Sequence, residues 1–234
     1  GIERGFTTFD GPSGVERQAD QTIEAAMAWL EAADMSKPWL LWVHLYDPHN
    51  PYEAPEPWAR KFVGQGDQAS WLVERAFTEK SSRPTGQEVE TVSANDMYDG
   101  EIHFMDGQIG RLMVAIAKKQ VKPIILVVGD HGEGLGQHGQ SGHGRIWNEQ
   151  VRVPMMLLAP GIVPGRHGAT TGVMDAIPTL LGTLNVEGRS EFLAQASGVD
   201  VLDAKAEERE IYSMQPMRLV SMFGVLPAHS LTTS

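Results

Sequence analysis

The sequence predicts an α/β fold in which a mostly parallel sheet is flanked by helices. Short apolar runs have the length and composition of buried strands, and they lie at residues 39–46, 124–128 and 153–159. Between them, apolar residues at three-and-four spacing indicate amphipathic helices at residues 14–34, 88–119 and 172–184. The chain has 234 residues, of which 41% are hydrophobic, so it can bury a sizeable core.

The first helix and the first strand lead into a polar loop. The helix presents Ile23, Met27 and Leu30 on one face, and the strand at 39–46 runs into the loop at 47–52. Prolines restrict this loop, so we expect His49 to be held in place. Two interpretations of His49 stay open: it hydrogen-bonds an anionic oxygen, or it bonds only the nearby backbone. His44, inside the strand, is interpreted as a core histidine.

The middle of the chain combines an irregular segment with a long helix. Prolines and glycines interrupt residues 53–88, which predicts a surface excursion with a short helix at 70–77. The helix at 88–119 follows, and Lys118 and Lys119 suit the negative end of its dipole. On this helix Glu101 and Asp106 either support a site from behind or cap neighbouring backbone.

The strand at 124–128 is the centre of the prediction because it ends in Asp130-His131-Gly132. Ligands of open α/β sheets bind at the carboxyl ends of the strands. A carboxylate and an imidazole at that place are common ligands of a divalent cation, so we expect Asp130 and His131 to bind a metal ion. The alternative is that Asp130 caps a turn while His131 packs.

A loop rich in glycine and histidine follows the strand. Glycines around His138 and His143 let the backbone approach a ligand closely and turn the imidazoles inward. The same composition occurs in solvated loops and adventitious metal sites, so both interpretations stay open. After this loop we expect one helical turn at 145–150 and, beyond the last helix, a short strand at 211–213.

Composition excludes some classes of function. With 19 Lys and Arg against 30 Asp and Glu, the net charge of −11 opposes binding to nucleic acid or to anionic membranes. The chain has no cysteine, so neither a disulfide nor a thiolate nucleophile forms. No apolar run approaches the roughly 18 to 20 residues that span a bilayer, and no signal-peptide pattern is visible.

Five sequence blocks, in this order, resemble the sulfatase family of the alkaline-phosphatase superfamily. The blocks are Gly5-Phe6; His44-x-x-Asp47-Pro48-His49-x-Pro51-Tyr52; Tyr98-x-x-Glu101-x-x-x-x-Asp106-x-x-Ile109-Gly110; Gly129-Asp130-His131-Gly132-Glu133; and His143-Gly144-x-x-x-x-Glu149-x-x-Arg152-Val153-Pro154. The resemblance implies metal-dependent hydrolysis of sulfate esters, as in arylsulfatases, on a small molecule or a saccharide. It also implies one Ca²⁺, less often Mg²⁺ or Mn²⁺, and a periplasmic or extracellular location.

Individual residues match the family's functional positions. By resemblance, Asp130 and His131 stand where two metal ligands lie, with His131 replacing an asparagine of many members. His49 stands where a histidine hydrogen-bonds the sulfate, and His143 stands where many members place a lysine with that role. Arg152 matches a block that we interpret as structural.

One family feature is absent from the sequence. Members carry a Cys-x-Pro-x-Arg or Ser-x-Pro-x-Arg signature whose first residue becomes the formylglycine nucleophile, and this chain has neither. We therefore expect a central-to-C-terminal fragment that is inactive without its N-terminal part. Residues 1–200 are expected to form a partial catalytic domain and residues 201–234 the start of a truncated C-terminal subdomain. Alternatives are a phosphonate monoester or phosphodiester hydrolase of the same superfamily, or a non-catalytic metal- or anion-binding module.

Overall fold

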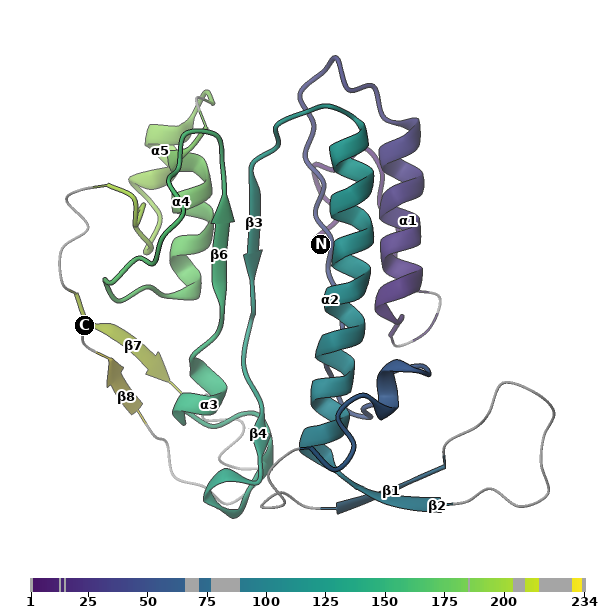
Figure 1. The fold of residues 1–234 in the computed structure, drawn as a ribbon. Helices are drawn as coiled ribbons and strands as arrows, with labels where there is room; N and C mark the ends of the chain where they lie inside the picture. Colours follow the sequence, from purple (N-terminus) through teal and green to yellow (C-terminus); the bar gives the residue numbers. More distant parts are fainter. Residues whose placement is uncertain are drawn as a thin grey trace. The chain divides into compact units, whose positions relative to one another are not determined.

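The computed structural model describes residues 2–12, 14, 16–65, 72–76, 89–184, 186–203, 209–214 and 229–232. The chain divides into two compact units, Gly1–Val121 and Lys122–Ser234 (Figure 1). Helices and two-stranded sheets occur in both units, which confirms the predicted α/β class.

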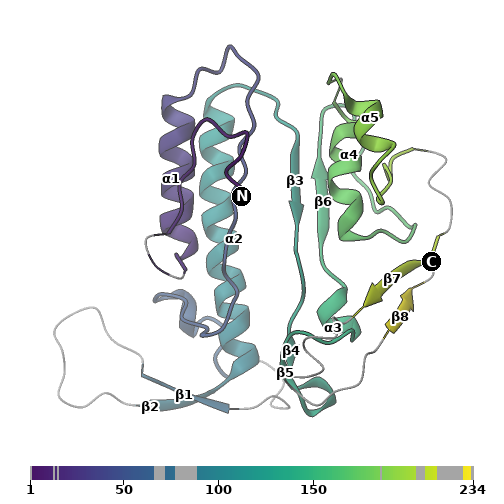
Figure 2. The ribbon, with the colours of Figure 1, turned by 180° about the vertical axis from the view of Figure 1, so that it is seen from behind.

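Two helices form the core of the first unit. Helix α1 (Ala19–Ala32) and helix α2 (Ala94–Lys118) lie side by side (Figures 1 and 2). Ile23 and Leu30 of α1 are almost fully buried against Leu112 and Ile116 of α2. The apolar spacing of the sequence therefore predicted both helices correctly, although each begins several residues later than expected.

A second cluster of buried side chains lies along the N-terminal half of α2. Ala54, Ala59 and Phe104 are buried there, next to the 3₁₀ helix η1 (Trp58–Arg60). The Trp58 ring lies so close to Gly107 that a Cβ atom at that position would be 2.7 Å from the ring. A glycine in α2 thus makes room for the indole, and this contact fixes the chain that follows the polar loop at 47–52.

Residues 39–46 are not assigned to a strand, although their exposure alternates as it does in one. Leu41, Val43 and Leu45 pack against the α1–α2 core, whereas Trp42 on the other face is 55% exposed. His44 shares the exposed face and stacks on Trp42, with ring centroids 6.3 Å apart. The interpretation of His44 as a core histidine is therefore wrong. A strand is defined by its neighbours, and the described residues form no ladder with this segment.

The helix predicted at residues 70–77 is also wrong. Strand β1 (Leu72–Ala76) occupies this position and pairs antiparallel with β2 (Val89–Ser93), with Leu72 opposite Ser93. β2 is rich in β-branched residues, which favour a strand, so α2 begins only at Ala94. Ser93 caps the helix by accepting a hydrogen bond of 3.2 Å from the Asn95 amide.

The second unit contains the two predicted strands that flank the glycine- and histidine-rich loop. Strand β3 (Ile125–Val128) pairs antiparallel with β6 (Met155–Leu158). Every strand pair among the described residues is antiparallel, so the prediction of mostly parallel pairing is wrong for these strands. Parallel neighbours need a long crossover, usually a helix. The longest helix in the link between β3 and β6 is the four-residue α3 (Asn148–Val151), and the chain folds back to pair antiparallel.

Short elements complete the second unit. The predicted helix at 172–184 consists of η3 (Val173–Asp175) and α4 (Ala176–Gly182), and α4 packs on β3. The remaining elements are β4 (Gly134–Leu135), η2 (Gln137–Gly139), β5 (Ser141–Gly142), α5 (Arg189–Leu193), β7 (Ile211–Met214) and β8 (His229–Thr232). β7 confirms the predicted strand near residue 211. The predicted domain boundary near residue 200 stays a prediction.

A buried carboxylate connects α4 to the chain that leads to β7. Asp175 is fully buried, and it accepts hydrogen bonds from the backbone amides of Gly172 at 2.7 Å and Val199 at 2.9 Å. It also pairs with Arg209. Because a buried charge is stable only when it is paired and hydrogen-bonded, Asp175 joins three segments of the second unit.

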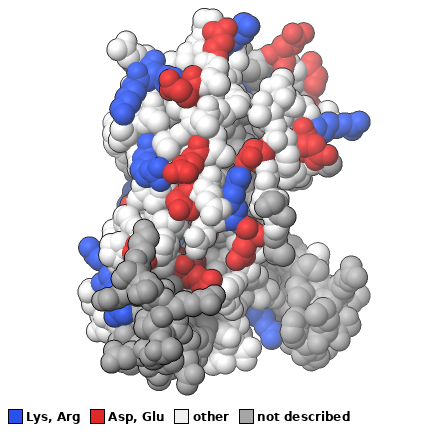
Figure 3. Space-filling model, turned by 90° about the vertical axis from the view of Figure 1, so that its right-hand side faces the viewer, with Lys and Arg blue, Asp and Glu red and all other residues white. Residues whose placement is uncertain are grey.

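The surface in Figure 3 shows Lys and Arg side chains interspersed with Asp and Glu. Two ion pairs join α1 to α2: Glu24 with Arg111 at 3.4 Å and Glu31 with Lys119 at 2.7 Å. Exposed pairs of this kind contribute only about 0 to 1 kcal/mol each. None of the helices in the described part of the chain is both long and apolar enough to cross a membrane.

Candidate active site

The carboxyl end of β3 presents the predicted metal ligands to solvent. The Asp130 carboxylate accepts a hydrogen bond of 2.8 Å from the His131 amide, and its side chain is 82% exposed. His131 Nδ1 lies 2.9 Å from the Gly132 carbonyl oxygen. A carbonyl only accepts, so Nδ1 is the donor, and Nε2 of the neutral ring carries the lone pair that binds a metal ion.

The geometry of these two residues fits one shared cation. His131 Nε2 lies 3.8 Å from Asp130 Oδ2. That separation is shorter than the sum of an imidazole–metal distance of about 2.1 Å and a carboxylate–Ca²⁺ distance of about 2.4 Å, so a single ion can reach both atoms. Among the described residues, no group of three or more His, Cys, Asp or Glu could hold a metal ion. The role of Asp130 and His131 as metal ligands therefore stays a prediction.

Gly132 brings the end of β3 against helix α3. Its amide donates a hydrogen bond of 2.8 Å to the Gln150 carbonyl oxygen. A Cβ atom on Gly132 would lie 2.1 Å from the Glu149 carbonyl oxygen, so only glycine allows this approach. The turn that follows directs the next side chain, Glu133, into the protein, where the residue is only 8% exposed.

His143 lies next to the end of β3. Its ring lies against the His131 ring, with centroids 4.2 Å apart. On its other side, His143 Nδ1 hydrogen-bonds Glu133 Oε2 at 3.4 Å. Asp130, His131 and His143 thus form one cluster, in which two imidazoles and one exposed carboxylate surround the strand end.

His138 faces a different set of neighbours. Its ring lies 4.5 Å from the Trp147 ring, and its Nε2 is 3.5 Å from Glu149 Oε1. The residue has a left-handed backbone with φ of 56°, which is uncommon outside glycine. Gln150, also from the α3 region, accepts a hydrogen bond of 2.7 Å from the Arg145 amide. The contacts with Trp147 and Glu149 hold the His138 ring in place within the loop.

His49 belongs to the first unit, where the loop at 47–52 is held by helix α2. The Glu101 carboxylate accepts a hydrogen bond of 2.6 Å from the Glu53 amide, and the Tyr52 and Tyr98 rings meet edge to face at 5.5 Å. Glu101 therefore binds the backbone that follows this loop, and its support of a site stays a prediction. Asp106, on the same helix, is exposed.

The His49 ring contacts its own loop. Its Nδ1 lies 2.7 Å from the Asn50 carbonyl oxygen, and the ring packs 4.5 Å from Tyr46. The backbone-bonded interpretation therefore holds for Nδ1, which acts as the donor to this carbonyl. Nε2 is then the nitrogen with which the neutral ring accepts a proton.

Asp47 begins this loop with a carboxyl group whose pKa is raised, chiefly because burial disfavours the charged form. The Ala19 amide at the start of α1 acts in the opposite direction, and the nearby Asp20 and Glu16 raise the pKa further. One carboxyl oxygen, Oδ2, is buried without a hydrogen bond.

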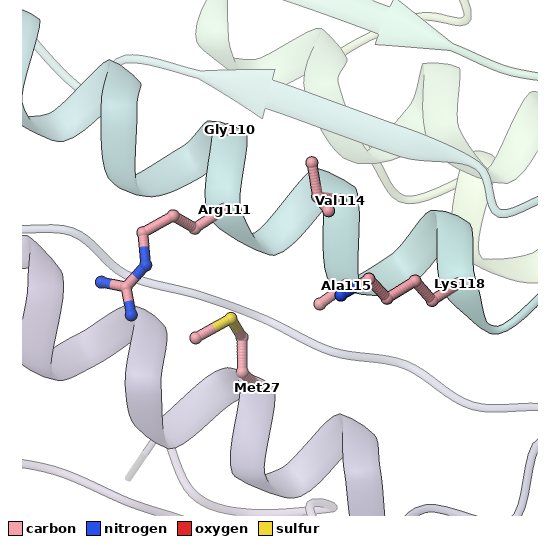
Figure 4. A pocket seen from close by; sticks show the side chains of 6 residues that line it. All are labelled: Met27, Gly110, Arg111, Val114, Ala115 and Lys118. Atoms are coloured by element: carbon pink, nitrogen blue, oxygen red, sulfur yellow. The ribbon is translucent and has the colours of Figure 1, made fainter.

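A shallow groove lies between α1 and α2, away from both polar loops in the sequence. Met27 from α1 and Arg111, Val114 and Lys118 from α2 line it (Figure 4). Arg111 is engaged with Gln108 and Glu24. The groove contains none of the predicted site residues.

Sequence reasoning missed the contribution of Glu133 and Gln150. Glu133 follows Asp-His-Gly directly, but nothing in the local pattern shows that its carboxylate reaches a histidine ten residues later. Gln150 is 2% exposed, and its contact with the Arg145 backbone depends on α3 folding over the loop. Both contacts arise from the folded structure, so the local sequence does not reveal them.

Comparison with known proteins gives a consistent result. A family model described as Sulfatase matches residues 5–186. The chain is 28% identical to a choline-sulfatase of Rhizobium meliloti over 162 residues, which cover 62% of this chain and 31% of that protein. It is 26% identical to an arylsulfatase of Clostridium perfringens over 190 residues, which cover 73% of this chain and 39% of that protein.

Two further likenesses extend over more of the chain. A protein of Trinickia caryophylli, the multifunctional alkaline phosphatase superfamily protein PehA, is 25% identical over 257 residues, with 91% of this chain and 49% of that protein covered. The solved structure of Bacteroides fragilis YidJ, described as a sulfatase, superposes with a TM-score of 0.63 at 18% identity over 84% of this chain and 44% of that one. This confirms the predicted fold. The chain spans between about a third and a half of the length of these proteins.

Proposed function

Because the chain belongs to the sulfatase family, we propose that the polar loop after β3 provides part of a metal-dependent site that hydrolyses sulfate esters. The observation that carries this proposal is the contact between the His131 and His143 rings beside Asp130, at the end of β3. An imidazole cluster next to a partial cation site suits an anionic substrate even though the whole chain is negatively charged. The substrate is a small sulfate ester or a sulfated saccharide.

Asp130 and His131 are proposed to hold the cation, with further ligands from elsewhere in the complete protein. Ca²⁺ is proposed first and Mg²⁺ or Mn²⁺ as alternatives, because a carboxylate-containing site suits hard cations. Such a cation, when bound, lowers the energy of negative charge that develops on the substrate oxygens. The separation of 3.8 Å between His131 Nε2 and Asp130 Oδ2 supports this assignment.

His143 and His49 are proposed to bind the sulfate group. The His143 side chain is 39% exposed, so the ring is accessible while its Nδ1 is engaged with Glu133. His49 hydrogen-bonds the Asn50 carbonyl oxygen through Nδ1, which fixes the orientation of its ring, and its role in binding sulfate is proposed from the family resemblance. A positioned imidazole also protonates a leaving alcohol, a role typically worth about 10²- to 10⁴-fold in rate.

The nucleophile is proposed to come from outside these 234 residues. The chain contains no cysteine that could become formylglycine, and no Ser-x-Pro-x-Arg signature. The proposal is therefore that these residues alone do not turn over a sulfate ester. A periplasmic or extracellular location is part of the same proposal.

A second function is proposed from the family resemblance, and the likeness to PehA, described as a multifunctional protein of the alkaline phosphatase superfamily, is compatible with it. In this case the same site hydrolyses a phosphonate monoester or a phosphodiester. Both substrates place anionic oxygens on a tetrahedral centre, so the loops described above suit either one. A third outcome is a module that binds a metal or an anion without catalysis.

The protein expressed from the whole reading frame provides the test. We expect 4-nitrocatechol sulfate to be hydrolysed faster than phenylphosphonate or bis(4-nitrophenyl) phosphate, with activity lost in EDTA and restored by Ca²⁺. His143→Ala should reduce kcat/KM by about 100-fold or more. His138→Ala is the matched control, because His138 faces Trp147 and Glu149 instead.

The other outcomes separate the alternatives. A preference for the phosphonate or the diester assigns the second function. No hydrolysis together with a tight, stoichiometric Ca²⁺ site in calorimetry assigns the module. Turnover of the sulfate ester by a sample of these 234 residues alone contradicts the proposed need for an external nucleophile.

A further inference from the structure

Two histidines of the loop after β3 each contact a glutamate carboxylate. Glu133 contacts His143 and Glu149 contacts His138, with separations of 3.4 and 3.5 Å. The exposure differs sharply within the first pair, because the Glu133 side chain is 5% exposed and the His143 side chain 39%. A buried carboxylate thus lies behind an accessible imidazole.

The backbone explains why Glu133 and His143 meet. Strands β4 and β5 pair antiparallel with Gly134 opposite Gly142, so the residues just outside this rung are neighbours. A Cβ atom on Gly134 would lie 2.7 Å from the Gly142 carbonyl oxygen, so the close approach requires glycine. Glu133 Oε1 also accepts a hydrogen bond of 3.2 Å from the Gly134 amide, which fixes the carboxylate beside the rung.

We propose that Glu133 is a positioning residue that holds His143 in the tautomer with its proton on Nδ1. An ionised carboxylate has no hydrogen to donate, so the hydrogen bond at 3.4 Å requires Nδ1 to be the donor. Nε2 is then the nitrogen that accepts a proton, and the imidazolium formed in this way can donate that proton to a leaving group. A carboxylate behind a histidine has this orienting effect in hydrolases and at metal sites.

This inference rests on the proposed function only where it assigns Nε2 of His143 a role toward the substrate. The tautomer itself is a property of these 234 residues and does not depend on a nucleophile, a metal ion or turnover. A test of the tautomer therefore fails or succeeds independently of a test of sulfatase activity.

Nitrogen-15 NMR of the histidine-labelled 234-residue chain measures the tautomer directly. Long-range proton–nitrogen correlations distinguish a protonated ring nitrogen from one that carries a lone pair, at a pH where the ring is neutral. His143 is assigned by loss of its signals in His143→Gln. We expect a protonated Nδ1 and an unprotonated Nε2. A wild-type spectrum with the proton mainly on Nε2 overturns the proposal, whatever the variants show.

Variants then identify Glu133 as the cause. Glu133→Met keeps the length of the side chain but removes the acceptor, so the proton should move largely to Nε2. Glu133→Gln keeps one acceptor oxygen and adds a donor, so a mixture of tautomers is expected, and it serves if Glu133→Met fails to fold. Glu149→Gln is the matched control, because it should leave His143 unchanged and affect only His138. An unchanged His143 spectrum in folded Glu133→Gln and Glu133→Met rules out the role of Glu133.

Activity of the whole reading frame adds a second readout. If sulfate esters are hydrolysed, Glu133→Met should lower kcat by at least tenfold with little change in KM, and Glu133→Gln should recover part of the loss. If the tautomer is as proposed but no ester is hydrolysed, the positioning role stands and the proposed function fails.

Discussion

The two polar loops that contain the predicted site residues are held in different ways. The loop at 47–52 is fixed from a distance, because Glu101 of α2 accepts the Glu53 amide 48 residues away in sequence. The loop at 129–144 is fixed from within, by contacts among residues 129–152 such as Glu133 with His143 and Gly132 with Gln150. The first loop therefore depends on the helical core of its unit, whereas the second carries its own scaffold.

This difference determines where each loop is vulnerable. A loop with a local scaffold depends on close backbone approaches, and glycines make these possible. A loop anchored to a distant helix depends on the anchoring side chain, because a buried carboxylate and the amide it binds are costly to separate. Substitutions in the two loops should therefore destabilise the protein by different mechanisms and by different amounts.

The largest effect is expected for Gly132→Ala in the locally held loop. The new Cβ atom would lie 2.1 Å from the Glu149 carbonyl oxygen and 3.0 Å from its carbonyl carbon. Backbone must move to relieve this clash, and overpacking of this kind costs about 3 kcal/mol in the unfavourable cases. Urea denaturation followed by circular dichroism measures the loss in the free energy of unfolding.

Gly165→Ala is the control for this change. A Cβ atom at Gly165 meets nothing within 4 Å, so the free energy of unfolding should stay within about 0.5 kcal/mol of the parent value. Equal stability of the two variants would show that the backbone of α3 is not in close contact with Gly132 after β3.

The contrast between local and distant contacts also explains which features the sequence predicted. Helices α1 and α2 follow from local apolar spacing, as the burial of Ile23 and Leu30 shows. Asp130 and His131 were predicted as metal ligands because they follow an apolar strand after a single glycine, and this role stays a prediction. These signals need no knowledge of distant residues.

The missed features depend on pairing between segments. Strand β1 was predicted as a helix because its partner β2 lies beyond an intervening segment, and strand preference depends on such neighbours. The antiparallel pairing of β3 with β6 could not be predicted from their apolar runs, because buried parallel and antiparallel strands have similar apolar sequences. Glu133 reaches His143 only because Gly134 and Gly142 pair, and two glycines carry no periodic signal.

A smaller effect is expected for Glu101→Ala in the loop that α2 anchors. Glu101 is 4% exposed and accepts the Glu53 amide at 2.6 Å, so its loss leaves a partly buried donor unsatisfied. Loss of a hydrogen bond to a charged group costs about 2 kcal/mol. Urea denaturation measures this cost, and hydrogen exchange should show faster exchange of the Glu53 amide.

The exposed Asp106 on the same helix provides the matched control. Asp106→Ala should change the free energy of unfolding by no more than about 0.5 kcal/mol and leave the Glu53 amide protected. If Glu101→Ala behaves in the same way, the loop at 47–52 is not anchored through α2.

The smallest effect concerns the pH dependence of stability at Asp47. Burial raises the pKa of this carboxyl group in the folded state, so the folded protein binds more protons than the unfolded chain between the two pKa values. Stability contributed by this group therefore falls as pH rises from the unfolded pKa of about 3.9 through the folded pKa. Asp47→Asn should gain less than about 1 kcal/mol at neutral pH, because Asp47 is only half-buried. The gain should vanish in acid, as measured by thermal denaturation across a pH series.

Asp34→Asn should show the opposite sign, since hydrogen bonds from Ser36 lower the pKa of Asp34. A gain for Asp47→Asn that persists below the unfolded pKa would mean that packing, and not burial of the charge, limits stability at this end of the loop.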